Sequence, residues 1–275
     1  MNAKTSPVLP IETRVKRLDI SLFDEIDSQT CADDRRSMLA IQEAVSARCP
    51  SFTYLEIGSH LGGSIQPFLL DPRCARIVSI DKRPTAQADE RGGAGRYPGN
   101  STERMLKNLR SIAKDQVVKV TTFDADSSAV KPSMLPSKVA VCFIDGEHTN
   151  AAVERDFAFC ESVLTHPGLI YFHDSDIVFQ ALANIVERLK AAGRSFHAYN
   201  LPSSIFVIDL EMNIHGDASI QSLLLNNHLG YLSSLESMAH YRDFYTGWFA
   251  RTLRKAYSIG PVRIAARTIR NIANR

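Results

Sequence analysis

Five short apolar runs recur between residues 52 and 174, and each ends in polar residues. The runs are rich in β-branched and aromatic residues, and their apolarity is nearly continuous. That is the pattern of strands buried on both faces of a parallel sheet. The runs are FTYLEIG at 52–58, ARIVSID at 75–81, VVKVTTF at 117–123, VAVCFID at 139–145 and LIYFHD at 169–174.

Stretches with the 3.6-residue period of amphipathic helices separate these runs. The first predicted helix begins near Asp33, a candidate N-cap, and ends before Pro50. Its apolar residues share one face: Met38, Ile41, Ala44 and Val45. Further helices are expected at 64–70, 101–113, 150–164 and 177–193.

Alternation of strands and helices predicts a doubly wound α/β domain with a mostly parallel sheet. We place this domain at residues 51–210. Before it lie an N-terminal leader and helix (1–50), and after it a helical, basic C-terminal extension (211–275). The stretches 195–199 and 203–210 are candidates for an antiparallel pair at the sheet edge.

Composition narrows the class of protein. With 275 residues and 44% hydrophobic positions, the chain can build one sizeable core. A formal net charge of +2 gives no global signal for nucleic acid. The 5 scattered cysteines have no CxxC spacing, so they imply neither a disulfide framework nor a zinc cluster, and they favour a reducing, cytoplasmic setting. We expect residues 1–30 to wrap on the surface or to be partly disordered, and we expect neither a secretory signal nor a membrane span.

The first strand leads into a glycine-containing turn, Glu56 to Ser64. Gly58 permits a tight turn, and the segment up to Ser64 leaves helix N–H groups open to a ligand. A dinucleotide site would need a second glycine where this chain has His60. S-adenosylmethionine has no pyrophosphate, and Glu56 could accept hydrogen bonds from its ammonium group. An ordinary turn between strand and helix is the alternative.

Two further strand ends fit an adenosine. Asp81 follows the second strand, 23 residues after Gly58, where a carboxylate can accept both ribose hydroxyls. After the third strand, Asp124 or Asp126 could accept from an adenine amino group, and Ala125 lies between them. A helix N-cap explains this acidic turn nearly as well.

The fourth and fifth strand ends carry the reactive groups. Neighbouring strands would bring Asp145, His173 and Asp174 together at the reactive end of the cofactor, as oxygen and nitrogen ligands for a divalent ion. His148, three residues after Asp145, is a candidate general base. The alternatives are loop-capping aspartates and a histidine that caps the following helix.

With these strand ends the chain resembles the class I S-adenosylmethionine-dependent methyltransferases, and more narrowly a branch with macrocin-type sugar O-methyltransferases and cephalosporin-hydroxylase-like proteins. The similar segments are YLEIGSHLGGSI, IVSIDKRP, YPGNSTERMLKNL, CFIDGEHTNAAVERDF and GLIYFHDSD. The resemblance implies a Rossmann-like sheet of seven strands with a reversed edge hairpin. It also implies a cofactor held by Glu56, Gly58, Ser59, Asp81 and Asp124 to Asp126.

The resemblance further implies a magnesium ion held by Asp145 and by two adjacent acids after the next strand, with His148 as the base. Here that pair is His173 and Asp174, and a histidine shifts the preference from magnesium towards manganese, iron or zinc. Asp176 could supply the missing oxygen.

The expected activity is O-methylation of a hydroxyl in a sugar, a glycan or a natural product, a small-molecule or glycan acceptor. Two rivals stay open: a nicotinamide-dependent oxidoreductase and a non-catalytic adaptor attached by its basic tail. Residues 84–100 form a glycine-containing loop that is either a lid over the cofactor or a disordered insertion.

The segment 241–275 carries eight Arg or Lys residues against one acid, with aromatic residues near its start. A basic amphipathic helix of this kind can pack within a homo-oligomer, on its own domain, or on an anionic membrane surface. We favour packing over membrane contact.

Overall fold

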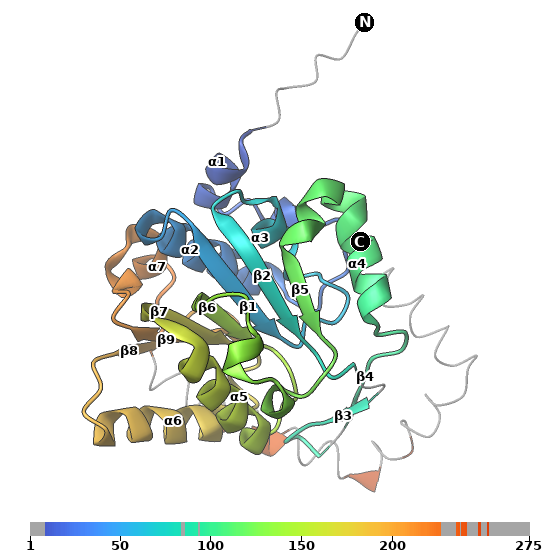
Figure 1. Cartoon of the computed structure of the whole chain (residues 1–275). Coiled ribbons are helices and arrows are strands. Elements are labelled where there is room, and N and C mark those ends of the chain that lie inside the picture. Colours follow the sequence, from blue (N-terminus) through green and yellow to red (C-terminus); the bar gives the residue numbers. More distant parts are fainter. Residues whose placement is uncertain are drawn as a thin grey trace, which may run out of the picture.

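The computed structural model describes residues 9–83, 86–92, 94–226, 235–236, 238–240, 247–248 and 252. Its centre is a seven-stranded sheet in the order β5-β2-β1-β6-β7-β9-β8 (Figure 1). The strands are β1 (Phe52–Ile57), β2 (Cys74–Ile80), β5 (Val120–Phe123), β6 (Val139–Ile144), β7 (Leu164–Phe172), β8 (His197–Asn200) and β9 (Phe206–Leu210).

Strand pairing confirms the predicted sheet. β1 lies parallel to β2 and β6, β5 is parallel to β2, and β7 is parallel to β6. β9 runs antiparallel to both β7 and β8, so the expected hairpin closes one edge. The chain leaves β1 towards β2 on one side and later returns to β6 on the other. The carboxyl ends of β1 and β6 therefore flank the switch point, where open α/β sheets bind ligands.

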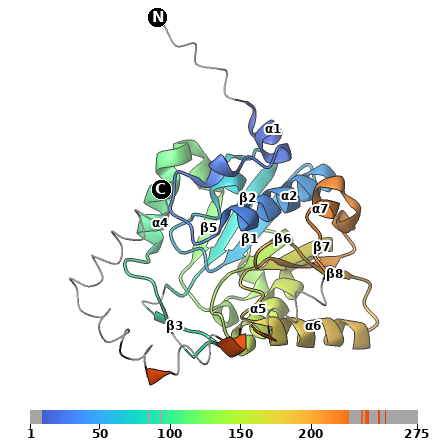
Figure 2. The same ribbon diagram turned by 180° about the vertical axis from the view of Figure 1, so that it is seen from behind.

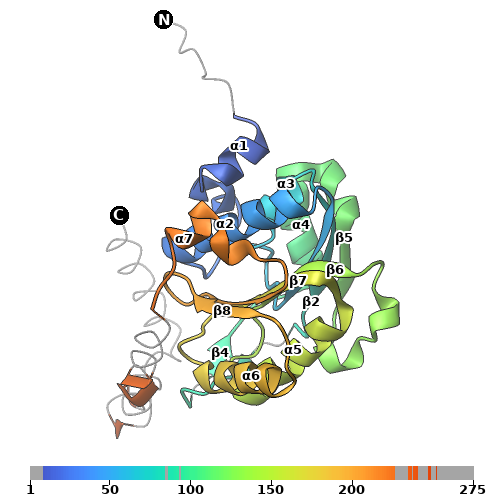
Figure 3. The ribbon, with the colours of Figure 1, turned by 90° about the vertical axis from the view of Figure 1, so that its left-hand side faces the viewer.

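Helices cover both faces of the sheet. Figure 2 shows α2 and α7 from the opposite side to Figure 1, and Figure 3 shows α2, α3 and α7 on one face with α5 and α6 on the other. The helices are α1 (Ile11–Lys16), α2 (Ala32–Arg48), α3 (Gln66–Leu70), α4 (Thr102–Ala113), α5 (Asn150–Val163), α6 (Phe179–Ala191) and α7 (Ala218–Gln221). Short 3-10 turns are η1 (Ile20–Phe23), η2 (Lys114–Lys119), η3 (Ser127–Ala129), η4 (Pro132–Met134) and η5 (Ile214–Gly216).

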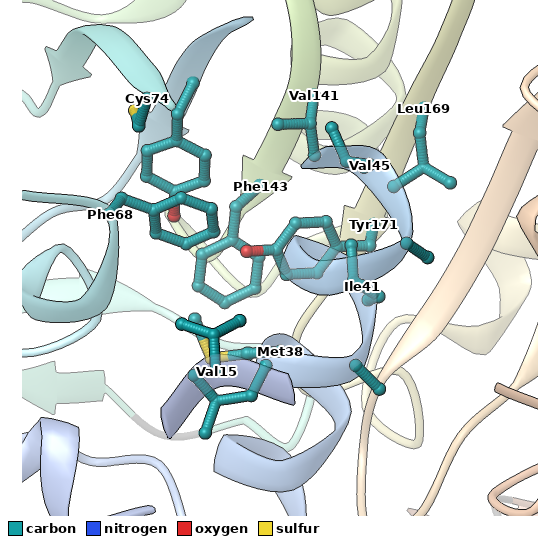
Figure 4. Close-up of a cluster of buried hydrophobic side chains, with 14 of the residues drawn as sticks. Val15, Met38, Ile41, Val45, Phe68, Cys74, Val141, Phe143, Leu169 and Tyr171 are labelled. Atoms are coloured by element: carbon teal, nitrogen blue, oxygen red, sulfur yellow. The ribbon is translucent and has the colours of Figure 1, made fainter. Parts of the chain in front are cut away.

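Two apolar layers separate the sheet from these helices. In the layer under α2, the ring of Phe143 stacks on Tyr171 at a centroid distance of 4.5 Å. These rings lie beside Met38 and Ile41 of α2, as Figure 4 shows. Like Met38 and Ile41, the other residues of the predicted helix face are buried, which confirms that face. Because apolar burial is the main favourable term in folding, this contact fixes α2 firmly on the sheet.

The described part of the N-terminal leader lies on the surface, as one of the two expectations had it. Val15 and Phe23 are fully buried, and Leu22 is 2% exposed, so residues 9–30 also add side chains to the core. The start of α2 differs from the prediction, because Cys31 is the N-cap and Asp34 accepts from its backbone N–H at 2.8 Å.

The predicted loop at 84–100 contains a small hairpin. Strands β3 (Ala86–Ala88) and β4 (Ala94–Arg96) pair antiparallel, and the described part of this loop is thus not a disordered insertion. The prediction for the basic tail at 241–275 lies almost entirely outside the described residues. Among the described helices, none combines the length and apolarity that a membrane crossing requires.

Candidate functional site

The turn after β1 is built around Gly58. Its φ is +96°, and a Cβ at this position would lie 2.0 Å from the backbone oxygen of Asp145. Its N–H donates to the Ile80 carbonyl at 2.8 Å. Only glycine allows both the left-handed backbone and this close approach. The ends of β1, β2 and β6 are therefore held in direct contact.

Asp81 lies in this junction, at the end of β2, and is 4% exposed. Its carboxylate accepts the backbone N–H of His60 at 2.9 Å and that of Arg83 at 2.8 Å. The Arg83 guanidinium also lies 3.2 Å away. These donors fix the carboxylate toward the turn, while each oxygen keeps a further lone pair for a ligand.

A hollow of about 500 Å³ opens at this junction. It brings together Gly58, Ser59, Ser64, Asp81, Asp145 and His148, all of which were predicted site residues. The Ser59 hydroxyl is buried and has no hydrogen-bond partner among the described residues. An unpartnered buried hydroxyl is costly unless a ligand or water meets it, so this wall fits a polar ligand.

Glu56 lies beneath the hollow. It is fully buried and accepts the hydroxyls of Tyr54 and Ser64, each at 2.5 Å. Burial is the main cause that raises the pKa of Glu56 to about 7; the two hydroxyls oppose the shift, and the charges of Asp145 and Asp81 add to it. The Ser64 hydroxyl stands between this carboxylate and the hollow, so direct contact of Glu56 with a ligand ammonium stays a prediction.

A second hollow of about 270 Å³ adjoins Gly58 and Asp81 on the side of β5. Ala125 and Asp126 line it, as an adenine site requires. Asp126 also caps η3, accepting from the Ser128 N–H at 3.0 Å, so the alternative N-cap role is real. Asp124 does not line either hollow: its side chain is 56% exposed and accepts from the Thr102 hydroxyl.

Three side chains converge where β6 and β7 end. His148 Nε2 lies 3.1 Å from Asp174 Oδ2 and 3.7 Å from Asp145 Oδ1. One ligand atom each from Asp145, His148 and Asp174 lies within 4.8 Å of the other two, so the three residues could hold a metal ion. Burial lowers the pKa of His148, but Asp145 and Asp174 outweigh it and raise that pKa above its usual value. Burial opposes ionisation of Asp174, yet His173 and His148 hold its pKa at about 2.

His173 lies beside Asp145 and Asp174, as expected, and its role as an ion ligand stays a prediction. Its Nδ1 lies 3.1 Å from Asp145 Oδ1, and its Nε2 lies 3.2 Å from Asp34 Oδ2. Burial disfavours the charged ring, but these carboxylates raise the pKa of His173 well above its usual value. Both ring nitrogens of His173 thus have carboxylate partners. The histidine in the candidate metal group with Asp145 and Asp174 is His148, not His173. Asp176 is not part of that group either.

Asp34 is the site residue that sequence reasoning missed. It lies 139 positions before His173, in the first turn of α2, where an acid is ordinary. No local signal marks it, because its role depends on how α2 packs on the sheet.

The β3–β4 hairpin covers the reactive side of the site. The Glu90 N–H donates to the His148 carbonyl at 3.0 Å, and Glu90 Oε1 accepts from the Asn150 N–H at 2.8 Å. A third hollow lies between the hairpin and the reactive cluster. Its polar lining residues are Gln29, Gln87, Asp89, Arg91, Arg96, Tyr97, His148 and Asp174.

A comparison with known protein families bears directly on this site. Residues 55–175 match the model of a methyltransferase domain. The match runs from β1 to just beyond Asp174, so it spans all the strand ends described above. It confirms, at the level of the domain, the class of enzyme that these strand ends predicted.

The individual proteins that this chain resembles have low sequence identity to it. Uncharacterized protein R132 of Acanthamoeba polyphaga mimivirus is 24% identical over 184 residues, which is 62% of this chain and 78% of that protein. The O-methyltransferase TomG of Streptomyces achromogenes, solved with SAM, is 15% identical, with 75% and 92% of the two chains covered and a TM-score of 0.46. An O-methyltransferase of Bacillus cereus, solved with SAH, is 13% identical, with 75% of this chain and 93% of that chain covered and a TM-score of 0.44. CalS11, a TDP-rhamnose 3'-O-methyltransferase of calicheamicin biosynthesis, is 16% identical, with 75% and 97% of the two chains covered and a TM-score of 0.48.

Proposed function

We propose that this protein is an S-adenosylmethionine-dependent methyltransferase that methylates a hydroxyl oxygen. The observation that carries the proposal is the shared hollow of Gly58, Asp81, Asp145 and His148. In one space it joins a turn suited to adenosine with a carboxylate and imidazole pair suited to proton removal. The methyltransferase-domain match covers the same strand ends.

The residues fit S-adenosylmethionine better than a dinucleotide. The unpartnered Ser59 hydroxyl offers a hydrogen bond to the methionine part, and Asp81 has lone pairs left for ribose hydroxyls. His60 has a φ of +43° and lines the hollow, and its side chain takes the place that a pyrophosphate turn reserves for glycine. Ala125 and Asp126 then face the adenine.

The reactive cluster also fits a divalent ion. Asp145 and Asp174 supply carboxylate oxygens, the preferred ligands of Mg²⁺ and Mn²⁺. His148 Nε2 is buried without a hydrogen bond of good geometry among the described residues, so this nitrogen is available to an ion or to a substrate proton. When bound, the ion would polarise the acceptor hydroxyl and lower its pKa.

The chain's own residues then perform the proton transfer. His148 Nε2 takes the hydroxyl proton, and Asp174, at 3.1 Å, stabilises the imidazolium that forms. The oxygen's electron pair makes the new bond to the methyl carbon. The carbon–sulfur bond breaks with its electrons staying on sulfur, which leaves S-adenosylhomocysteine. Holding both reactants in line supplies much of the rate enhancement.

A hydroxyl-rich acceptor, such as a sugar, a glycan or a natural product, suits the third hollow. Its walls are mainly polar, with amide groups from Gln29 and Gln87 and the hydroxyl of Tyr97. The positive charge of Arg91 is matched by Asp89, which it contacts through two guanidinium nitrogens. Such a lining offers many hydrogen bonds and little surplus charge near the reacting oxygen.

Calorimetry with three ligands separates this proposal from its rivals. We expect S-adenosylmethionine and S-adenosylhomocysteine to bind and NAD not to bind. Binding of NAD alone would favour an oxidoreductase, and no binding of any of the three ligands would favour an adaptor. Transfer of labelled methyl from S-adenosylmethionine to a panel of sugars and glycosides then tests the acceptor class.

A further inference from the structure

We propose that Asp34 is a positioning residue, which acts through His173 to fix the carboxylate of Asp145 for a divalent ion. The inference rests on the proposed function, because it concerns the ion site of that same reaction. It assigns a role to α2, which lies outside the matched methyltransferase domain.

The geometry is a continuous chain of three side chains from three elements. Asp34 on α2 contacts His173 Nε2 at 3.2 Å, and His173 Nδ1 contacts Asp145 Oδ1 at 3.1 Å. Asp34 is 2% exposed and His173 is 8% exposed, so bulk water does not compete for these contacts. The last side chain of this series, Asp145, is a carboxylate of the candidate metal group.

Asp34 itself is held rigidly. Its Oδ2 accepts the Cys31 N–H at 2.8 Å, and its Oδ1 accepts the Ser204 N–H at 3.3 Å. The helix that carries it buries Met38 and Ile41 against the sheet. A carboxylate fixed by two backbone donors on a packed helix can orient a ring better than a mobile surface acid.

The ring of His173 needs this anchor because it has two competing acceptors. Its Nδ1 lies 3.1 Å from Asp145 Oδ1 and also 3.5 Å from Asp174 Oδ2. With Asp34 in place, Nε2 is tied down and the ring plane is set. Without Asp34, the ring can turn away from Asp145, so this ligand loses its fixed orientation. Removal of a group that hydrogen-bonds to a metal ligand usually lowers metal affinity or activity by about 10- to 100-fold.

The test measures Mn²⁺ binding by electron paramagnetic resonance in the full chain. We expect Asp34→Ala to weaken Mn²⁺ binding by about 10-fold or more, and to leave S-adenosylhomocysteine affinity within about twofold of wild type. Asp33→Ala is the matched control: Asp33 lies in the same helical turn, but it is exposed and pairs with Arg36 at 2.7 Å. This control should bind both ligands as wild type does.

A second variant guards against misfolding. Asp34→Asn keeps one oxygen that can accept from both Cys31 and His173 but has no charge, so we expect it to fold and to lose Mn²⁺ affinity by a smaller factor, about threefold to 10-fold. Wild-type affinity in both Asp34 variants overturns the proposal, and so does a wild-type protein that binds no Mn²⁺. Failure of S-adenosylhomocysteine to bind any variant instead counts against the proposed function, so the two failures are distinguishable.

Discussion

His148 Nε2 lies 3.1 Å from Asp174 Oδ2, although the two residues follow different strands of the sheet. The contact exists because β6 and β7 are parallel neighbours, so their carboxyl ends reach the same edge. It places a carboxylate beside the nitrogen that would take the substrate proton, so the charge of Asp174 can stabilise the imidazolium that forms.

Replacing His148 should separate chemistry from binding. In His148→Gln, we expect methyl transfer to fall by about 100-fold or more, because a positioned base contributes at least that factor. Affinity for S-adenosylhomocysteine should stay near wild type, since the adenosine side of the hollow is intact. Single-turnover transfer of labelled methyl, on an acceptor that wild type uses, measures the first quantity. His197→Gln, an exposed histidine on the edge strand, is the control.

Mn²⁺ affinity of the same variant decides between two roles for His148. If His148 is the base and the two carboxylates hold the ion, His148→Gln keeps Mn²⁺ affinity within about threefold of wild type. A loss of 100-fold or so would make the imidazole an ion ligand and contradict its role as base.

Gly58→Ala should damage both stability and cofactor binding. The added Cβ would meet the Asp145 carbonyl at 2.0 Å, so the turn and the β6 end must separate. Gly193→Ala is the matched control, because Gly193 has a φ of +64° but open space around it. We expect the control to lose about 1 kcal/mol in urea unfolding and Gly58→Ala to lose at least about 3 kcal/mol. Equal losses in the two variants would show that the close approach at Gly58 has no energetic role.

Glu56 should make stability depend on pH. The folded protein holds its proton up to a pKa of about 7, whereas the unfolded chain releases it near the ordinary value of 4.5. The contribution of Glu56 is therefore fully present below pH 4.5 and is lost as pH rises to about 7. Glu56→Gln should remove this decline. From acid to neutral pH, the free energy of unfolding of Glu56→Gln should therefore rise by on the order of 3 kcal/mol relative to that of wild type.

Urea unfolding across that pH window checks the Glu56 prediction. Glu187→Gln serves as the control, because Glu187 is exposed and pairs only with Lys190 among its charged neighbours in the described structure. Parallel stability curves for wild type and Glu56→Gln would contradict the raised pKa of Glu56.

Asp81 and Asp124 should behave differently, although both are acids at strand ends that were predicted to hold the cofactor. Asp81→Asn should weaken S-adenosylhomocysteine binding by about 10-fold or more, because the ribose loses a charged acceptor. Asp124→Asn should change it by about twofold at most, because Asp124 lines neither hollow. Isothermal titration of both variants gives the comparison, and a larger effect at Asp124 would reverse the assignment.

Much of the fold could be predicted because its signals are local. Buried strands such as β6 are continuous apolar runs, and the turn at Gly58 needs a residue type that the sequence displays directly. Strand ends on one edge then follow from parallel pairing alone, which brought Asp81, Asp145 and His148 to one hollow.

The remaining features depend on packing across long separations. Whether His173 or His148 faces the ion group depends on which carboxylates surround each ring, and one of these, Asp34, comes from a distant helix. The burial of Val15 and Phe23 likewise depends on how the leader meets the core. Composition and periodicity carry no information on such contacts.

A crystal structure with S-adenosylhomocysteine bound tests the central claim most directly. The account predicts ribose hydroxyls on Asp81, the homocysteine part along the turn at Ser59, and the sulfur facing Asp145 and His148. A ligand whose ribose lies away from Asp81, or whose sulfur points away from His148, would contradict it.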